Sequence, residues 1–560
     1  MPALRHRSAA SWGGVRRCRV SSGPMRRQDR SLVAVLGLVS VCSTFLAVSA
    51  ATAAPLAEPP LAATPQAECG PGDAVETDIQ GRVTPEDHAE GRAARGFWCN
   101  AERIATFGGD AAEGTVGGFK VERYVDESGR ECAYYDSTLL FGTDLFDGGV
   151  GTNVLDMSDP TDPVLTASLV TPAMLSPHES LLVNQERGLL VATLGNPGFN
   201  VGILDVYDIS DDCRDPQLLS SSPAGILGHE SGFAPDGMTF YSASPATQTL
   251  VPVDLTDPSL PVPLTSYRID SHGLSLRADG DRAYVASLDG LVILDVSEVQ
   301  AREPNPIIRE VSRLSWTSMS IPQNAIPITI GGEPYVVEID EFGAQDAVGA
   351  ARIIDIADET RPEVLSNLRL QVHQPESFER QAADPGASSP IQGYAGHYCN
   401  VPTRVDPTIV ACSMIMSGLR VFSIVDPANP VEIAYYNAPS DPDLPTAGSY
   451  AMASPSFVPE RDEIWYSDGH SGFHVVRLAD GVWPAAGSAP IQTPTTEPTT
   501  TAAPTSAAAP VPTQATQATQ VARSTLPATG GTAPLPLAFA AMLSGIAALW
   551  LVVRSRRSTD

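Results

Sequence analysis

The 560-residue sequence predicts an all-β fold, a seven-bladed β-propeller, from three observations. A run of aliphatic and β-branched residues, closed by an Asp/Ser/Pro turn, recurs six times, and its copies are 52, 46, 41, 60 and 68 residues apart. These spacings fit four-stranded blades with insertions better than helical repeats of about 33–34 residues. The runs hardly alternate between apolar and polar residues, so we expect both sheet faces to be covered. The 46 glycines and 49 prolines add many turns.

The composition excludes one class of partner. The chain has 35 Lys and Arg residues against 65 Asp and Glu residues, which gives a net charge of −30. A phosphate backbone would be repelled by this charge, so we expect no nucleic-acid partner. Lys120 is the only lysine, which argues against Schiff-base chemistry.

The N-terminus has the three parts of a secretory signal peptide. Arginines precede an apolar run over residues 32–48, and an A-x-A site follows at Ala51 and Ala53. We expect cleavage between Ala53 and Ala54, so residues 1–53 form the signal segment, with Met25 as the expected true start. The alternative is a signal anchor that is never cut.

The C-terminus predicts attachment to a cell wall. An apolar stretch over residues 535–553, long enough to cross a bilayer, precedes a basic tail. The motif before it consists of Leu526, Pro527, Ala528, Thr529 and Gly530. Residues 526–560 together resemble the LPxTG sorting signal of Gram-positive surface proteins. The resemblance implies cleavage after Thr529 by sortase and linkage of Thr529 to peptidoglycan, with a membrane-anchored precursor. The alternative is a plain membrane anchor.

The region before this motif and the cysteines agree with export. Residues 481–525 are rich in Thr, Pro and Ala, which predicts a disordered stalk. Six cysteines remain in the mature chain, and an even number in an exported protein predicts disulfides. We expect the pairs Cys99–Cys132 and Cys399–Cys412, because each brackets a short segment, and Cys69–Cys213 by elimination.

Between the N-terminal extension, residues 54–95, and the stalk, residues 96–480 form the predicted propeller. Six blades carry the repeated phrase, and a seventh at residues 450–478 provides only three strands. We expect the strand at residues 101–107 to complete this last blade and so close the ring, because an open seam would expose unpaired backbone. A Cys99–Cys132 disulfide would tether this strand to the first blade.

The phrases resemble the LVIVD repeat, a propeller-forming repeat of exported bacterial and archaeal proteins. The most similar copy is Gly-Leu-Val-Ile-Leu-Asp-Val-Ser at residues 290–297. The resemblance implies the propeller fold and little about activity.

Histidines recur at the start of successive blades, at His178, His229 and His272, and a fourth lies at His397. The first strand of a propeller blade lines the central channel, where these imidazoles with the carboxylates of Glu179 and Glu230 would suit copper, zinc or iron. The alternative is that each histidine bonds an aspartate of its own blade, as buried polar groups commonly do. We expect this structural role, and we keep His178, His229 and His272 as candidate metal ligands.

The motifs leave the function open. The sequence contains no G-x-S-x-G elbow, HExxH motif or P-loop, so no catalytic residue is assigned. We expect a non-enzymatic module that binds or adheres to an unidentified extracellular ligand and holds no cofactor. The alternative is a surface metal-dependent oxidoreductase or hydrolase with a histidine-lined channel.

Overall fold

The computed structural model describes residues 59, 61–108, 117–137, 151–195, 202–343, 348–387, 393–440 and 448–491. All of them belong to one compact unit, residues 1–493. The predicted signal segment, most of the predicted stalk and the sorting signal lie outside the described residues. Within the described ranges, no helix is both long and apolar enough to cross a membrane.

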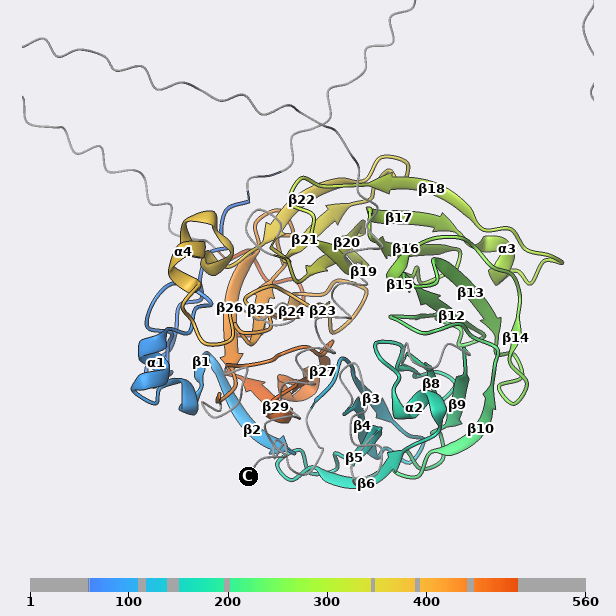
Figure 1. The fold of residues 1–560 in the computed structure, drawn as a ribbon, viewed down its shortest axis with the longest axis horizontal. Coiled ribbons are helices and arrows are strands. Elements are labelled where there is room, and N and C mark those ends of the chain that lie inside the picture. The colour runs from blue at the N-terminus through green and yellow to red at the C-terminus, as the bar shows by residue number, and fades with distance from the viewer. Residues whose placement is uncertain are drawn as a thin grey trace, which may run out of the picture. The chain divides into compact units, whose positions relative to one another are not determined.

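Seven antiparallel sheets surround a common axis, which confirms the predicted seven-bladed propeller (Figure 1). Blade one comprises β3 (Val121–Val125), β4 (Glu131–Asp136), β5 (Thr152–Asp156) and β6 (Val164–Leu169). Blade two comprises β7 (Leu182–Asn184), β8 (Leu189–Thr193), β9 (Leu204–Asp208) and β10 (Gln217–Ser222). Blade three comprises β11 (Gly232–Phe233), β12 (Thr239–Ser244), β13 (Thr249–Asp254) and β14 (Val262–Pro263).

The remaining blades follow the same order from the axis outward. Blade four comprises β15 (Ser271–Leu276), β16 (Arg282–Ser287), β17 (Gly290–Asp295) and β18 (Arg309–Leu314). Blade five comprises β19 (Ile321–Ile330), β20 (Glu333–Glu341), β21 (Ala351–Asp355) and β22 (Glu363–Leu368). Blade six comprises β23 (Tyr398–Asn400), β24 (Ile409–Ser413), β25 (Leu419–Ser423), β26 (Val431–Asn437) and β1 (Phe97–Cys99). Blade seven comprises β27 (Ser456–Val458), β28 (Glu463–Asp468), β29 (Gly472–Leu478) and β2 (Ala101–Phe107).

The repeated phrase forms the third strand and the turn after it. The inner aspartate caps this turn: Asp156 Oδ1 accepts hydrogen bonds from the backbone N–H of Ser158 at 2.9 Å and from its hydroxyl at 2.6 Å. Asp254 binds Thr256 in the same way. The recurring Asp-x-Ser/Thr pattern therefore ends strands and fixes turns.

The hydrophobic core lies between adjacent blades. One cluster joins Val337 and Ile353 of blade five to Val410 and Phe422 of blade six, and all four side chains are buried. Each sheet therefore packs against a sheet on either side, which explains why the strands carry apolar residues on both faces.

The N-terminal strands close the ring, as predicted. Strand β2 pairs with β29 through a register that runs from Ala101 opposite Leu478 to Phe107 opposite Phe473. Strand β1, just before it, pairs with β26 of blade six. In Figure 1 the blue β1 and β2 lie beside the orange β26 and β29. The two ends of the propeller are therefore joined by backbone hydrogen bonds.

Three disulfides form, but two of the expected pairings are wrong. Cys399–Cys412 is correct and links facing residues of β23 and β24. The other two bonds are Cys69–Cys99 and Cys132–Cys213. Cys99 lies on the outer strand of blade six beside the N-terminal extension, whereas Cys132 lies on the second strand of blade one. Chain proximity therefore misled the expectation, because the ring separates these two strands.

The N-terminal extension packs against blade six through buried ion pairs. Arg420 is fully buried, contacts Glu76 of the extension, and pairs with Glu432 at 3.1 Å. Its guanidinium also lies 4.5 Å from the ring centre of Tyr435. A buried arginine needs such partners, so this extension is part of the folded unit.

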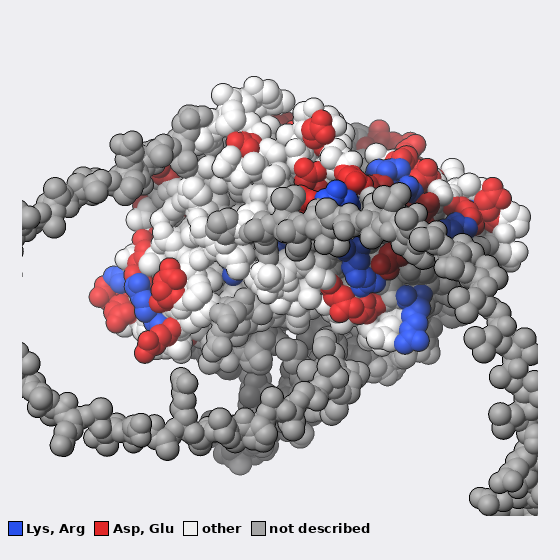
Figure 2. Space-filling model, turned by 90° about the horizontal axis from the view of Figure 1, so that it is seen from above, with Lys and Arg blue, Asp and Glu red and all other residues white. Residues whose placement is uncertain are grey.

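Short helical segments occupy the connections. The α-helices are α1 (Pro85–Ala89), α2 (Pro172–Leu175), α3 (Ser297–Gln300) and α4 (Phe378–Gln381). The 3-10 turns are η1 (Ala93–Arg95), η3 (Gln371–His373), η4 (Pro375–Ser377) and η5 (Pro459–Arg461). On the face seen in Figure 2, acidic and basic side chains lie intermixed.

Candidate metal centre

The structure brings the histidines of four blades together at one end of the axis. His178 and His229 precede the inner strands β7 and β11, His272 lies at the start of β15, and His397 precedes β23. The ring centres of His178 and His229 are 4.5 Å apart, and those of His229 and His272 are 4.2 Å apart. The three candidate ligands named from the sequence therefore form one cluster.

Two glutamates complete a closed ring of contacts with these histidines. Going around the ring, the contacts are His272 Nε2 to His229 Nε2 at 3.1 Å, His229 Nδ1 to Glu179 Oε2 at 2.6 Å, Glu179 Oε1 to His397 Nε2 at 3.3 Å, His397 Nε2 to Glu341 Oε2 at 3.1 Å, and Glu341 Oε1 to His272 Nε2 at 3.3 Å. A separation of 3.1 Å between His272 Nε2 and His229 Nε2 is that of a hydrogen bond between the imidazoles, and it also fits two nitrogens that share one ion.

Backbone carbonyls fix how two of the imidazoles are presented. His272 Nδ1 lies 2.7 Å from the carbonyl oxygen of Pro322, and His397 Nδ1 lies 2.6 Å from that of Met452. A carbonyl oxygen only accepts, so each Nδ1 carries a proton. In neutral His272 the Nε2 then turns a lone pair inward, whereas in protonated His397 the Nε2 donates toward Glu179 and Glu341. Metal-binding histidines are commonly oriented by such a bond.

The contact between His229 and Glu179 requires a cation or a proton. The backbone N–H of Glu230 donates to His229 Nδ1 at 2.9 Å, so this nitrogen already acts as an acceptor. Glu179 Oε2, another acceptor, lies 2.6 Å from the same atom. Two electron-rich atoms at this distance repel unless a positive charge lies near them.

His178 adds a third possible metal ligand beside His229 and Glu179. Its Nε2 lies 3.8 Å from Glu179 Oε2. Within the described residues its Nδ1 is buried and has no hydrogen-bond partner. His178, Glu179 and His229 form one group with metal-ligand spacing, and Glu179, Glu341 and His397 form a second. Glu179 belongs to both groups.

Burial and the neighbouring charges of the cluster shift the pKa values of its histidines in opposite directions. Burial and the neighbouring His229 lower the pKa of His178 to about 3 and that of His272 to about 4. These imidazoles are therefore neutral at pH 7, which is the form that binds a metal. Burial opposes the charge on His397, but its contacts with Glu179 and Glu341 outweigh burial and raise its pKa to about 10. In the metal-free protein a proton on His397 thus balances part of the carboxylate charge.

Backbone strain also concentrates here. His178 has a φ of 53° and Phe342 has a φ of 50°, both in the left-handed region that non-glycine residues rarely adopt. The ring centre of Phe342 lies 5.7 Å from that of His397. Gly195 leaves the space His178 needs, because a Cβ there would lie 2.2 Å from the His178 Cβ. Such strain commonly marks functional sites.

The expected bonds between histidines and aspartates of the same blade are wrong. Within the described part of the chain, His178, His229 and His272 make no hydrogen bond to Asp208, Asp254 or Asp295, whose carboxylates instead cap their own turns. The histidines contact one another and nearby glutamates, which for His229 and His272 belong to other blades, because they lie at the axis where the inner strands converge.

Sequence reasoning missed Glu341. Blade five has no histidine at its start, where Trp316 stands, and contributes Glu341 from the end of β20 instead. Trp316 Nε1 donates to Asp340 at 3.0 Å and so supports the residue next to Glu341. The only signal in the sequence was that blade five lacks a histidine at its start.

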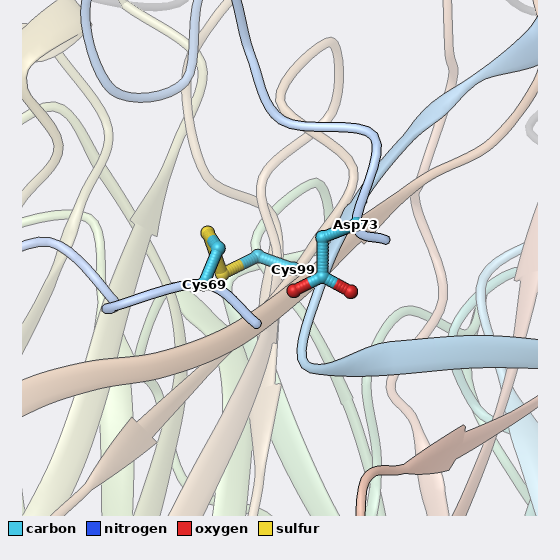
Figure 3. A group of neighbouring side chains, drawn as sticks. All are labelled: Cys69, Asp73 and Cys99. Carbon is cyan, nitrogen blue, oxygen red and sulfur yellow. A yellow bond between two sulfur atoms is a disulfide. The ribbon is translucent and has the colours of Figure 1, made fainter. Parts of the chain in front are cut away.

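A third group with metal-ligand spacing, away from the histidines, does not offer thiolates. Cys69, Asp73 and Cys99 lie close together, but Figure 3 shows the two sulfurs joined to each other. The Asp73 carboxylate accepts hydrogen bonds from the backbone of Gly70 and Asn100. This group therefore stabilises the N-terminal extension.

A layer of polar side chains lies next to the cluster along the axis. Gln323 Nε2 donates to Glu179 Oε2 at 2.8 Å and lies 2.6 Å from the hydroxyl oxygen of Tyr398. The Lys120 ammonium lies 4.3 Å from the Tyr398 ring centre and pairs with Glu230 Oε1 at 2.7 Å. Beyond Lys120 and Glu230 a cavity of about 470 Å³ follows the inner strands. The four side chains of this layer are buried and separate the cavity from the histidines.

Comparison with known proteins does not assign this chain to a family. No protein-family model and no curated protein matches the sequence, so the LVIVD resemblance stays a prediction. Among solved structures, the chain is similar to a protein from Lactobacillus plantarum, with 9% identity, a TM-score of 0.38, and coverage of 57% of this chain and 87% of that one. A candidate 6-phosphogluconolactonase from Bacteroides uniformis has 13% identity and a TM-score of 0.40, with coverage of 57% of this chain and 85% of that one. Hydrazine synthase of Kuenenia stuttgartiensis has 13% identity and a TM-score of 0.36, with coverage of 53% of this chain and 74% of that one. At these values the likeness carries no argument about the site.

Proposed function

We propose that this propeller is a metal-dependent enzyme whose axial cluster holds a divalent transition metal. The observation that carries the proposal is the convergence of His178, Glu179 and His229, whose ligand atoms all lie within 4.8 Å of one another. Imidazole and carboxylate donors around one point suit zinc, iron or copper better than calcium or magnesium, which prefer oxygen ligands alone.

The donor set favours catalysis over a purely structural ion. The group of His178, Glu179 and His229 offers two imidazoles and one carboxylate. Three protein ligands leave positions for water or substrate on zinc and on non-haem iron. His229 is also the most accessible of the four histidines, with 14% of its side chain exposed. Bound iron or copper would supply redox chemistry, whereas zinc would supply a Lewis acid and an activated water for hydrolysis.

Elemental analysis of the full chain, purified without chelators, tests this proposal. We expect about one transition-metal ion per chain, and we expect its loss when His229 and His272 are both replaced by alanine. The His88→Ala variant is the control, because His88 lies in α1 outside the cluster. Circular dichroism verifies that both variants fold. The proposal fails if the wild-type chain holds no stoichiometric metal after incubation with iron, copper and zinc, or if the double variant retains the ion.

We further propose that the enzyme is exported and attached to a Gram-positive cell wall. The sequence motifs at both ends support this, namely the A-x-A site before Ala54 and the sorting motif that ends at Thr529 and Gly530. A Thr529→Ala variant is expected to move from the wall fraction to the membrane or the medium, with Thr525→Ala, just outside the motif, as the control. Unchanged wall retention of Thr529→Ala would refute covalent anchoring.

The adhesion or ligand-binding role expected from the sequence is the second candidate function, after the metal-dependent enzyme. The convergence of the histidines favours the enzyme, whereas the same side chains pointing into separate blades would have favoured a binding module. One observation, the cavity beyond Lys120 and Glu230, does favour a bound small molecule. It is independent of the metal centre.

A further inference from the structure

The cavity of about 470 Å³ is a built channel with apolar walls. Its volume lies within the range of small-molecule sites. Its apolar walls are formed by side chains of blades two to five, namely Leu182, Phe233, Leu274, Leu276, Ile326 and Ile328. The channel opens beside Val405, which is 61% exposed. The buried pair of Lys120 and Glu230 closes its inner end.

Most charges in the channel are neutralised by the protein itself. Lys120 pairs with Glu230 at 2.7 Å. Arg277 pairs with Asp279 at 2.8 Å and with Glu359 at 3.1 Å. Paired charges of this kind need nothing from a ligand.

Two opposite charges in the same channel form no ion pair. Within the described residues, Arg404 has neither a side-chain hydrogen bond nor a salt bridge, and its side chain lines the channel at an exposed position, so the guanidinium stays cationic. Glu122 is hydrogen-bonded to the backbone of Val183 but has no cationic partner within salt-bridge distance. Burial raises the pKa of Glu122 to about 7. A carboxyl that is partly desolvated without a cation gains most from an ammonium group.

We propose that the channel binds a zwitterion with an apolar body, namely an apolar amino acid or a short apolar peptide. Arg404 receives the carboxylate, for which the planar guanidinium offers two parallel donors. Glu122 receives the ammonium group, and the aliphatic and aromatic walls cover the side chains. The polar layer of Gln323 and Tyr398 separates this site from the histidines. The site therefore does not depend on the proposed metal.

Calorimetric titration of the full chain with leucine and with leucyl-leucine tests the proposal. Two further ligands separate the charges: N-acetyl-leucyl-leucine lacks the ammonium group, and leucyl-leucinamide lacks the carboxylate. We expect leucyl-leucine or leucine to bind, and we expect removal of either charge from the dipeptide to weaken its binding by about tenfold or more.

Variants assign each charge to its residue. Arg404→Gln is expected to weaken binding of leucyl-leucine about tenfold and to leave leucyl-leucinamide unchanged, whereas Glu122→Gln affects the free dipeptide but not its N-acetyl form. The controls are Arg361→Gln and Glu102→Gln, which change exposed residues outside the channel. The proposal is overturned if neither zwitterion binds at millimolar concentration, if the blocked ligands bind equally well, or if the channel variants match the controls.

Discussion

Glu179 of blade two lies 2.6 Å from Nδ1 of His229 in blade three, and the same carboxylate lies 3.3 Å from His397 of blade six. One side chain thereby joins histidines from both sides of the axis. Because it also accepts a hydrogen bond from Gln323, its position is fixed from the adjoining polar layer. Glu179 is the residue on which the geometry of the cluster depends most.

A Glu179→Gln substitution is therefore expected to weaken metal binding about 10- to 100-fold. The amide keeps the size of the side chain but removes the negative charge that balances the metal and orients His229. Competition with a chromophoric chelator measures the change. Glu122→Gln is the matched control, because it neutralises a carboxyl of the channel that contacts none of the four histidines. Equal affinities in the two variants would contradict a role for Glu179 at the metal.

Much of the fold could be predicted from the sequence because the same local pattern, an apolar strand closed by an aspartate-capped turn, recurs from blade to blade. The aspartate at the end of the third strand binds the residue two positions later in blade after blade, as Asp156 and Asp254 do. The closing strand was also predictable, since a three-stranded last blade leaves an edge that β2 can fill. Local patterns and the need to pair strands were sufficient.

The histidine–glutamate cluster could be predicted from the sequence only in part. The histidines were recognised by their recurrence at blade starts, but their partners come from other blades and carry no local signal. Glu341 lies 69 residues from His272 in sequence, yet its carboxylate is 3.3 Å from that imidazole. The disulfides show the same limit, because Cys69–Cys99 and Cys132–Cys213 follow from which strands the ring places together.

The Cys132–Cys213 bond is expected to stabilise the protein more than Cys399–Cys412. The first closes a loop of 81 residues and links β4 of blade one to the loop after β9, whereas the second closes 13 residues within one hairpin. Loop-closure entropy then gives about 4.5 kcal/mol for the longer loop and about 3 kcal/mol for the shorter. Denaturant unfolding of the two double alanine variants, Cys132→Ala with Cys213→Ala and Cys399→Ala with Cys412→Ala, measures the difference. A larger loss in the hairpin variant would contradict the entropic account.

Asp136 is expected to make the protein less stable as the pH rises from about 4 to 7. Burial raises its pKa from 3.8 to about 7, although its Oδ1 accepts hydrogen bonds from the backbone of Phe119 and Lys120. In this pH window the native state binds the proton that the unfolded state has released, so stability falls with increasing pH. The contribution is at most about 4 kcal/mol.

An Asp136→Asn variant checks this dependence, because the amide cannot ionise. Its unfolding midpoints between pH 4 and 8 are expected to vary less than those of the wild-type chain. Asp159→Asn serves as the control, since Asp159 lies in an exposed turn. A pH slope that Asp136→Asn leaves unchanged would show that this carboxyl ionises freely.

Closure of the ring by β2 is expected to account for a large part of the stability. Ala105 of β2 is 9% exposed and packs in the seam between blades seven and one, beside Val121, Tyr135 and Trp465. An Ala105→Asp substitution would place an unpaired carboxylate in this apolar seam, and we expect it to lower the free energy of unfolding by about 3 kcal/mol or more. Arg103→Asp introduces the same group at an exposed position of the same strand and is expected to cost less than about 1 kcal/mol. Denaturant unfolding, together with protease digestion at the seam, compares the two variants. Similar stabilities would mean that β2 separates from β29 at little cost and that the ring holds together without it.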